Sequence, residues 1–270
     1  MGEVFFGIPT PLARALIEGL QLQAAVDTGT HLGDTAAALS EMVEQVSTVE
    51  LSHEYVERAK ARHAERPQIT FLEGSSPAVL ADLAPSLERA ALFWLDAHWC
   101  EADTAGYEAQ CPVLAEIEAI DTAPCAERSV ILIDDARFFL GCPWPTYRRS
   151  DWPSFMEVVD RLRARYPRYV TTLMDVIIAG PPEAREVVER FWQAKVFADL
   201  MNKSENGWRE VEVLRGRLAA AESRLSQAES HPAEAGARET KDEPGTARLL
   251  ARRVLPVTLR RELLRLSRRS

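Results

Sequence analysis

The stretch AALFWLDAHW, residues 90–99, decides the fold. It runs through consecutive apolar side chains and then ends in an acid, Asp96. A second stretch, SVILIDDA at residues 129–136, has the same form and ends in Asp134 and Asp135. Strands that are apolar on both faces are typical of parallel sheets covered by helices on both sides. The two stretches therefore predict central strands of an α/β fold.

Similar but shorter patterns lie on either side of these strands. Further strands are expected at 22–30, 46–52, 69–75, 169–173 and 175–180, the last two forming a terminal hairpin. Helices are expected over 12–20, 35–44, 54–64, 78–83, 112–120, 155–166 and 183–201. Strands that alternate with helices in this way predict a doubly wound α/β sheet.

Composition limits the classes of function. The chain has 270 residues, of which 46% are hydrophobic, and it carries a formal net charge of -9. An acidic chain is a poor general binder of nucleic acid. The sequence has no run of 18 apolar residues, so it predicts no membrane-spanning helix. Its first residues lack the basic and then apolar pattern of a secretory signal peptide. We therefore expect a cytoplasmic protein whose four scattered cysteines are free thiols. They are Cys100, Cys111, Cys125 and Cys142.

The pattern changes after Pro182, and four segments are predicted. Residues 1–182 form the α/β domain, 183–229 a helical and coiled-coil extension, 230–245 a flexible linker and 246–270 a basic amphipathic tail. The extension carries a coiled-coil seam because apolar residues recur at intervals of 3, 4, 3 and 4. They are Val211, Leu214, Leu218, Ala221 and Leu225.

The first motif with chemical meaning is VDTGTHLGDT, residues 26–35, where the first strand turns into a helix. Gly29 and Gly33 let the backbone approach a ligand closely. Glu50 ends the next strand, where an acid can accept hydrogen bonds from ribose hydroxyls. The motif indicates an adenosine-containing cofactor without separating NAD from S-adenosylmethionine (SAM), and an ordinary glycine-bearing turn stays possible.

Three carboxylates and one histidine form the second motif. Asp96, Asp134 and Asp135 follow two neighbouring strands, so they should meet at one edge of the sheet. Like charges this close need a neutralising partner, and oxygen ligands favour a hard ion such as Mg²⁺. His98 lies two residues beyond Asp96 and could accept a proton from a hydroxyl group near neutral pH. A turn-forming Asp-Asp pair and a structural histidine are the simpler alternatives.

The order of VDTGTHLGDT, VEL, EGSS, FWLDAHW and ILIDDA resembles class I SAM-dependent methyltransferases over about residues 20–180. More narrowly, it resembles the metal-dependent O-methyltransferases of the macrocin type, which act on sugars, with catechol O-methyltransferase more distant. The resemblance implies a Rossmann-like sheet of about seven strands with a C-terminal hairpin.

The resemblance also implies roles for the residues of both motifs. Asp27, Gly29 and Thr30 would bind the methionine part of SAM with Gly33 close by, Glu50 the ribose, and Gly74, Ser75 and Ser76 the adenine. Asp96, Asp134 and Asp135 match metal ligands, and His98 matches the catalytic base beside Asp96.

The loop after the fifth strand could bind the acceptor. Aromatic rings and arginine side chains suit a sugar or a phosphorylated sugar, although an ordinary packed loop is equally possible. The candidates are Trp144, Tyr147, Arg148, Arg149 and Trp152.

We therefore expect an enzyme that transfers a methyl group from SAM to a hydroxyl oxygen of a small molecule or glycan, assisted by a divalent metal. The alternatives are a nicotinamide-dependent oxidoreductase and a non-catalytic assembly or membrane-docking protein on the same fold. Residues 207–229 could form a homodimer or dock on the chain's own domain. Residues 246–270 could lie on an anionic membrane surface at its cytoplasmic side, dock on the acidic body or stay solvated.

Overall fold

A mixed sheet of seven strands organises the chain in the computed structural model, which describes residues 7–99, 106–141 and 146–230. The strand order is β3-β2-β1-β4-β5-β7-β6, and the chain divides into two units, Met1–Leu200 and Met201–Ser270. The strands are β1 (Ala24–Thr28), β2 (Gln45–Glu50), β3 (Ile69–Glu73), β4 (Ala91–Leu95), β5 (Val130–Ile133), β6 (Tyr169–Leu173) and β7 (Val176–Gly180).

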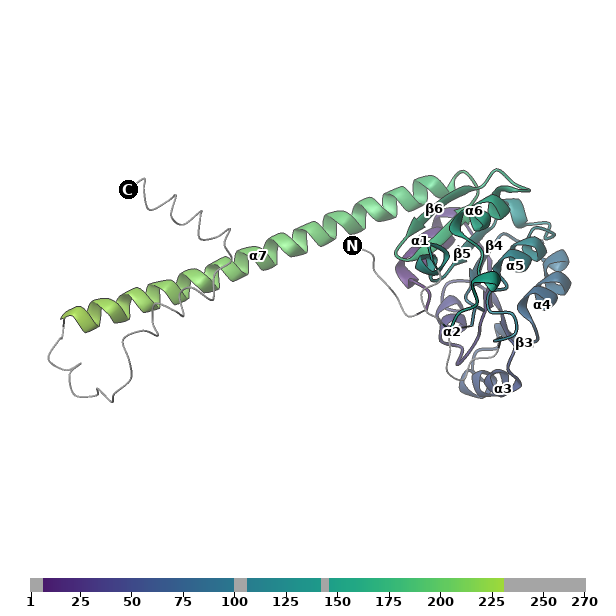
Figure 1. Ribbon diagram of the computed structural model, residues 1–270, viewed down its shortest axis with the longest axis horizontal. Coiled ribbons are helices and arrows are strands. Elements are labelled where there is room, and N and C mark those ends of the chain that lie inside the picture. Colours follow the sequence, from purple (N-terminus) through teal and green to yellow (C-terminus); the bar gives the residue numbers. More distant parts are fainter. Residues whose placement is uncertain (1–6, 100–105, 142–145, 231–270) are drawn as a thin grey trace. The chain divides into compact units, whose positions relative to one another are not determined.

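Helices cover both faces of the sheet (Figure 1). They are α1 (Thr10–Leu20), α2 (Asp34–Leu39), α3 (His53–Arg62), α4 (Ser76–Leu83), α5 (Val113–Ile120), α6 (Phe155–Arg163) and α7 (Ala184–Ser230). Short 3₁₀ turns span Ala84–Ser86, Ala126–Arg128, Ala136–Phe139 and Arg149–Asp151.

The central strands are buried on both faces, as their sequences predict. Along β4, Phe93 and Leu95 belong to the core that holds residues of α4, α5 and α6. The alternate residues Leu92 and Trp94 belong to a second core with residues of α1, α2 and the start of α7. All five residues of β4 are buried, which explains the unbroken apolar run. The predicted doubly wound fold is confirmed.

The sheet has a switch point between β1 and β4. Strand β1 pairs in parallel with β2 on one side and with β4 on the other. The chain therefore leaves β1 toward one edge and returns from β3 to the opposite side. Ligands of doubly wound sheets bind at such a point, outside the carboxyl ends of the strands. This places the ends of β1 and β4 at the expected site.

The terminal hairpin is also present, and it joins the sheet in the opposite direction. Strand β7 lies antiparallel between β5 and β6. Leu173 pairs with Val176, so the turn consists of Met174 and Asp175, both with positive φ (55° and 63°). Two such residues form the tight turn that matches the twist of a hairpin. A seven-stranded sheet that ends in a hairpin agrees with the fold that the resemblance to methyltransferases implied.

The ends of two helices differ most from expectation. The helix expected over 35–44 ends at Leu39, and turns lead into β2 at Gln45. Helix α7 continues as one helix to Ser230 instead of ending near Met201. Within the described residues, no helix has both the length and the apolarity needed to cross a membrane.

Candidate functional site

The loop that follows β1 is held tightly against its neighbours. Backbone N–H groups of Gly29 and Thr30 both donate to the carbonyl oxygen of Val49 in β2, at 2.9 and 3.2 Å. Gly29 has φ 89°, and a Cβ there would lie 2.3 Å from the carbonyl oxygen of Asp96. Only glycine fits a position with positive φ and no space for a side chain. The sheet therefore fixes this loop directly between β2 and β4.

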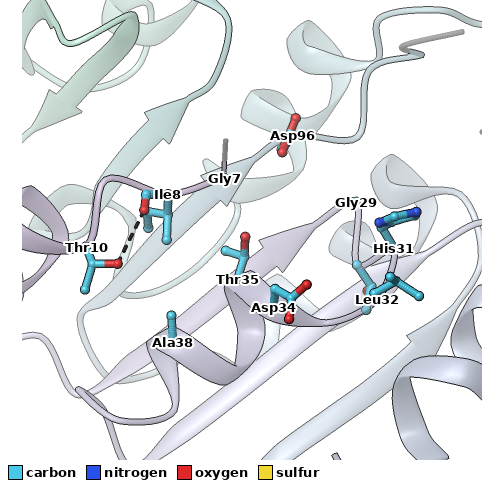
Figure 2. Close-up of a pocket in the computed structure, with 11 residues that line it drawn as sticks. Gly7, Ile8, Thr10, Gly29, His31, Leu32, Asp34, Thr35, Ala38 and Asp96 are labelled. Atoms are coloured by element: carbon cyan, nitrogen blue, oxygen red, sulfur yellow. Dashed lines mark hydrogen bonds between the residues drawn. The ribbon is translucent and has the colours of Figure 1, made fainter. Parts of the chain in front are cut away.

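A pocket of about 430 Å³ opens beside this loop. Figure 2 shows Asp96 and Gly29 on one side, and Asp34 and Thr35 of α2 on another. The segment Gly7, Ile8 and Thr10 completes the wall, together with Thr30, His31, Leu32 and Ala38. Carboxylate and hydroxyl side chains in such a lining suit a ligand with an ammonium group and polar oxygens. The sequence analysis did not predict a binding role for residues 7–10, because this segment carries no recognisable motif.

Glu50 links the loop after β1 to the loop after β2. One carboxylate oxygen accepts the backbone N–H of His31 at 2.8 Å, and the other accepts that of Ser52 at 2.9 Å. A carboxylate oxygen can accept more than one hydrogen bond. Glu50 therefore keeps acceptor capacity for ligand hydroxyls, although it does not belong to the pocket lining.

Asp27 lies completely buried beneath the same loop. Burial raises its pKa to about 8, against the hydrogen bond from the Thr48 hydroxyl at 2.7 Å, which lowers it. The hydroxyls of Thr48 and Thr30 are 2.6 Å apart. The second carboxyl oxygen of Asp27 has no hydrogen-bond partner among the described residues. Asp27 thus braces the loop from below and offers one acceptor that a donor from a ligand or a bridging water could use.

The remaining glycine and serine candidates lie at neighbouring strand ends. Gly33 has φ 79° and precedes α2, and a Cβ there would meet the ring of His63 at 2.8 Å. Gly74 follows β3 with φ 146° and donates its N–H to the Glu50 carbonyl oxygen. Ser75 precedes α4 and Ser76 begins it. None of these four lines the pocket, so their contacts with a cofactor stay predictions.

The acidic residues after β4 and β5 come together as their strand positions predict. The Asp96 N–H donates to Thr28, and the Asp134 N–H donates to Leu95, which continues the parallel ladder at both strand ends. His98 lies between the carboxylates. Its Nε2 is 2.8 Å from Asp135 Oδ2, and its Nδ1 is 3.7 Å from Asp96 Oδ1.

Burial and mutual charge shift the pKa values of this group. Burial raises the pKa of Asp134 to about 8, and the charges of Asp96 and Asp135 act in the same direction. Burial also raises the pKa of Asp96 to about 6, partly offset by His98. Burial opposes the charged form of His98. The hydrogen bond with Asp135 and the nearby carboxylates nevertheless raise its pKa above 6.5. His98 is thus a base whose strength the surrounding acids increase.

Asp135 is already engaged on both oxygens. His98 contacts Oδ2, and an η nitrogen of Arg137 lies 2.7 Å from Oδ1. Burial raises the pKa of Asp135, but the bonds with His98 and Arg137 outweigh burial and lower it. Arg137 also pairs with Asp175 in the hairpin turn. Sequence reasoning missed Arg137, because its partner Asp175 is distant in the chain and carries no motif.

The three carboxylates match the chemistry of a hard divalent ion, because they supply only oxygen donors and repel one another when ionised. Their arrangement is less favourable. The described residues contain no group of three His, Cys, Asp or Glu side chains placed to hold a metal. A metal ion at Asp135 would share its oxygens with His98 and Arg137.

The described aromatic residues of the loop after β5 do not present open faces, which favours the alternative of an ordinary packed loop. Trp152 and Tyr147 are buried. The Trp152 ring lies 5.4 Å from the His98 ring and 5.6 Å from Phe138. These rings wall off His98 from solvent. Trp144 lies outside the described residues.

The loops after β4 and β5 are joined by a second polar network. The side-chain carbonyl of Gln110 accepts the backbone N–H of Arg148 at 2.7 Å, and Gln110 itself is buried. The Arg148 side chain bonds to Asp151 and to the carbonyl oxygen of Tyr107. Arg149 begins the 3₁₀ turn and is exposed. Arg148 therefore closes the two loops on each other, and Arg149 is the arginine left facing solvent.

Glu116 is a buried carboxyl group that sequence reasoning also missed. It lies on α5, and one of its oxygens has no hydrogen-bond partner among the described residues. Burial raises its pKa, while Ser76 and Thr28 lower it. Glu116 is therefore a buried carboxyl group near Ser76 of α4 and Thr28 of β1.

Comparisons with known proteins find similar folds. Neither a protein-family model nor a curated protein matches the sequence. A similar solved structure is the O-methyltransferase from Bacillus cereus in complex with SAH, with 14% identity, a TM-score of 0.45, and coverage of 63% of this chain and 78% of that chain. A second is TomG from Streptomyces achromogenes, an O-methyltransferase involved in tomaymycin synthesis, in complex with SAM. It has 16% identity and a TM-score of 0.43, and the match covers 65% of this chain and 80% of that chain.

A third similar structure is the SAH-bound methyltransferase PaMTH1 from Podospora anserina, with 14% identity, a TM-score of 0.45, and coverage of 63% and 76%. These neighbours are methyltransferases bound to SAM or to SAH. Similarity at this level does not assign an activity, so the functional argument rests on the site itself.

Proposed function

We propose that the protein transfers a methyl group from SAM to a hydroxyl oxygen. The observation that carries this proposal is the position of His98. It lies between Asp96 and Asp135, and Asp96 also lines the pocket beside the glycine loop. A base and a cofactor-sized pocket thus share one residue, and a substrate hydroxyl between them could reach both.

The pocket residues fit the methionine end of SAM. Asp34 and Asp96 supply carboxylates for its ammonium group, while Thr10, Thr30 and Thr35 supply hydroxyls for its carboxylate. Glu50 lies one hydrogen bond beyond His31, where the ribose hydroxyls would follow. Gly74, Ser75 and Ser76 would then border the adenine. The tight loop around Gly29 holds these groups in place before the cofactor arrives.

His98 would act as the general base. When bound, SAM supplies the methyl group, whose bond to sulfur breaks as its bond to the acceptor oxygen forms. The hydroxyl proton passes to the ring nitrogen of His98 that faces the acceptor. Asp135 orients the imidazole and stabilises its charged form, as carboxylates do in catalytic triads. The aromatic wall of Trp152 and Phe138 excludes water from this proton transfer.

Metal assistance is a separate part of the proposal. Asp96, Asp134 and Asp135 would hold the ion. A bound Mg²⁺ would supply positive charge that lowers the pKa of the acceptor hydroxyl. The mutual repulsion of three ionised carboxylates at one sheet edge supports this part of the proposal.

We further propose a sugar or glycan as the acceptor and a cytoplasmic location, with the tail 246–270 at an anionic membrane. Exposed Arg149 supports an acceptor with anionic groups. The tail lies outside the described residues.

The proposal is tested by turnover. Purified protein is incubated with labelled SAM and a panel of sugars and nucleotide sugars, with Mg²⁺ or with excess EDTA. Methyl transfer that EDTA abolishes supports both the methyltransferase activity and the metal assistance. Transfer that persists in excess EDTA contradicts the metal assistance alone. Binding of NAD in place of SAM, measured by calorimetry, would contradict the methyltransferase assignment in favour of a nicotinamide-dependent enzyme.

A further inference from the structure

The distal part of α7 carries apolar side chains that face solvent. In the second unit of the chain, Leu214 and Leu218 are 49% and 60% exposed. They lie four residues apart, on one side of the helix. Exposed leucines at this spacing are unfavourable in water, so a partner that covers them would stabilise the helix.

The sequence around these leucines follows a heptad repeat. With Val211 at position a, the other core positions fall on Leu214, Leu218, Ala221, Leu225 and Ala228. Helix α7 includes every one of these residues, and it continues as one helix through them (Figure 1). The first heptad, with β-branched Val211 at a and Leu214 at d, has the combination that favours two-stranded coiled coils.

The charged residues beside this seam give the direction of pairing. In a parallel, in-register pair, each g residue lies beside the e residue five positions later on the other copy. The g positions hold Glu210, Arg217 and Arg224, and the matching e positions hold Arg215, Glu222 and Glu229. Each of the pairs 210–215, 217–222 and 224–229 therefore joins opposite charges.

An antiparallel pair does not satisfy the same charges. It brings g residues beside g residues and e residues beside e residues, so Arg217 of one copy would lie beside Arg224 of the other when the heptads overlap fully. Repulsion between these arginines opposes that arrangement, although Arg215 would lie beside Glu222 in it. The parallel, in-register pair with a second copy of the same sequence is the arrangement in which every g–e pair joins opposite charges.

We propose that residues 210–229 form a parallel, in-register coiled coil with a second copy of this chain. The seam covers Leu214 and Leu218, and the pairs of g and e residues set the register. This inference does not depend on the proposed methyl transfer. Three heptads with alanine at two d positions predict a reversible dimer whose population depends on concentration.

The test measures the dimer dissociation constant of the full chain by sedimentation equilibrium. Leu218→Glu should abolish dimerisation, whereas Ser223→Glu, at the outward f position, should leave it unchanged. Circular dichroism spectra and melting temperatures like those of the wild type confirm that the α/β domain of both variants is folded. A wild-type chain that stays monomeric at every soluble concentration overturns the proposal.

Charge reversal tests the orientation. Arg217→Glu places like charges beside Glu222 of the other copy at two symmetric positions, and it should weaken the dimer roughly tenfold. Glu222→Arg should do the same. Because each variant complements the other, an equimolar mixture should form a heterodimer of about wild-type affinity. Tighter association of Arg217→Glu alone would overturn the parallel arrangement, since the new glutamate would attract Arg224 in an antiparallel pair.

Discussion

At the scale of single residues, His98 combines the features of a base with those of a buried, oriented side chain. Asp96, His98, Asp134 and Asp135 were predictable as a group because parallel strands bring their carboxyl ends to one edge. The contacts of Asp135 with both His98 and Arg137 were not predictable from the sequence. The engagement of Asp135 by Arg137 depends on the turn at Asp175, which only the folded hairpin places there.

The role of His98 can be tested by truncation. His98→Ala should lower kcat by about 10²–10⁴-fold, the range typical of general bases, and leave SAM affinity nearly unchanged. Turnover under saturating SAM and calorimetric binding measure the two effects. An equal loss in both would indicate a structural role instead.

The pH dependence gives an independent check. The base must be neutral, and the hydrogen bond with Asp135 and the nearby carboxylates raise its pKa against the effect of burial, so kcat/KM should rise with pH above the range of an ordinary histidine. Asp135→Asn removes a hydrogen bond and a charge that raise this pKa, so the rise should move to lower pH. The pH–rate profiles of wild type and variant decide this, and an unmoved limb would assign the titration to another group.

Gly29 should be intolerant of any side chain. Gly29→Ala combines a positive φ with a clash against the Asp96 backbone, and such strain costs about 1–3 kcal/mol. We expect SAM binding to weaken roughly tenfold or more, as measured by calorimetry. Gly141→Ala is the matched control, since a Cβ there meets nothing within 4 Å. Equal SAM binding by both variants would show that the loop at Gly29 does not contribute to the cofactor site.

At the scale of elements, the strands were the most predictable part of the fold. The runs at β4 and β5 are apolar on both faces because both faces are covered, and that pattern is local. The two aromatic residues Tyr147 and Trp152 show the opposite case. Their composition was visible, but their burial depends on Phe138 and on the loop after β4, which no local pattern reveals.

One buried ion pair joins α5, α6 and the start of β6. Arg168, just before β6, lies 2.6 Å from Asp121 at the end of α5 and donates to the carbonyl oxygen of Leu162 in α6. Removing one partner of a buried pair leaves an uncompensated charge. Arg168→Met should therefore lower the free energy of unfolding by about 3–5 kcal/mol in urea titrations.

The control for this prediction is an exposed ion pair between α5 and α6. Arg161 of α6 lies 3.0 Å from Glu118 of α5, and both side chains contact solvent. Arg161→Met should cost less than about 1 kcal/mol. Similar losses in both variants would show that burial of Arg168 is not the source of its contribution.

At the scale of the whole molecule, the sequence carries segments that a minimal methyltransferase does not need. The division into 1–182, 183–229, 230–245 and 246–270 stays a prediction, and the last two segments lie outside the described residues. The composition of the basic tail, residues 246–270, predicts where in the cell the protein binds. Leucines and arginines alternate through it, which is typical of segments that lie on anionic bilayers.

This proposal is tested by flotation with anionic liposomes. The full chain should float at low salt and detach as salt screens the arginines, whereas a chain ending at Gly245 should stay in the soluble fraction. Flotation of neither version would assign the tail to the protein itself or to another partner. Flotation of both would place the membrane contact in the body.

The order of the sheet has a consequence for how the protein is made. Strand β5 exposes an apolar edge until the hairpin of β6 and β7 is synthesised, and an open edge of this kind can pair with other chains. Ribosomes add about 5–20 residues per second, so the 47 residues of α7 take roughly 2–9 s. A hairpin forms within about 1–10 μs. Because the hairpin forms far faster than α7 is translated, β7 can cover the edge of β5 before synthesis of the helix is complete.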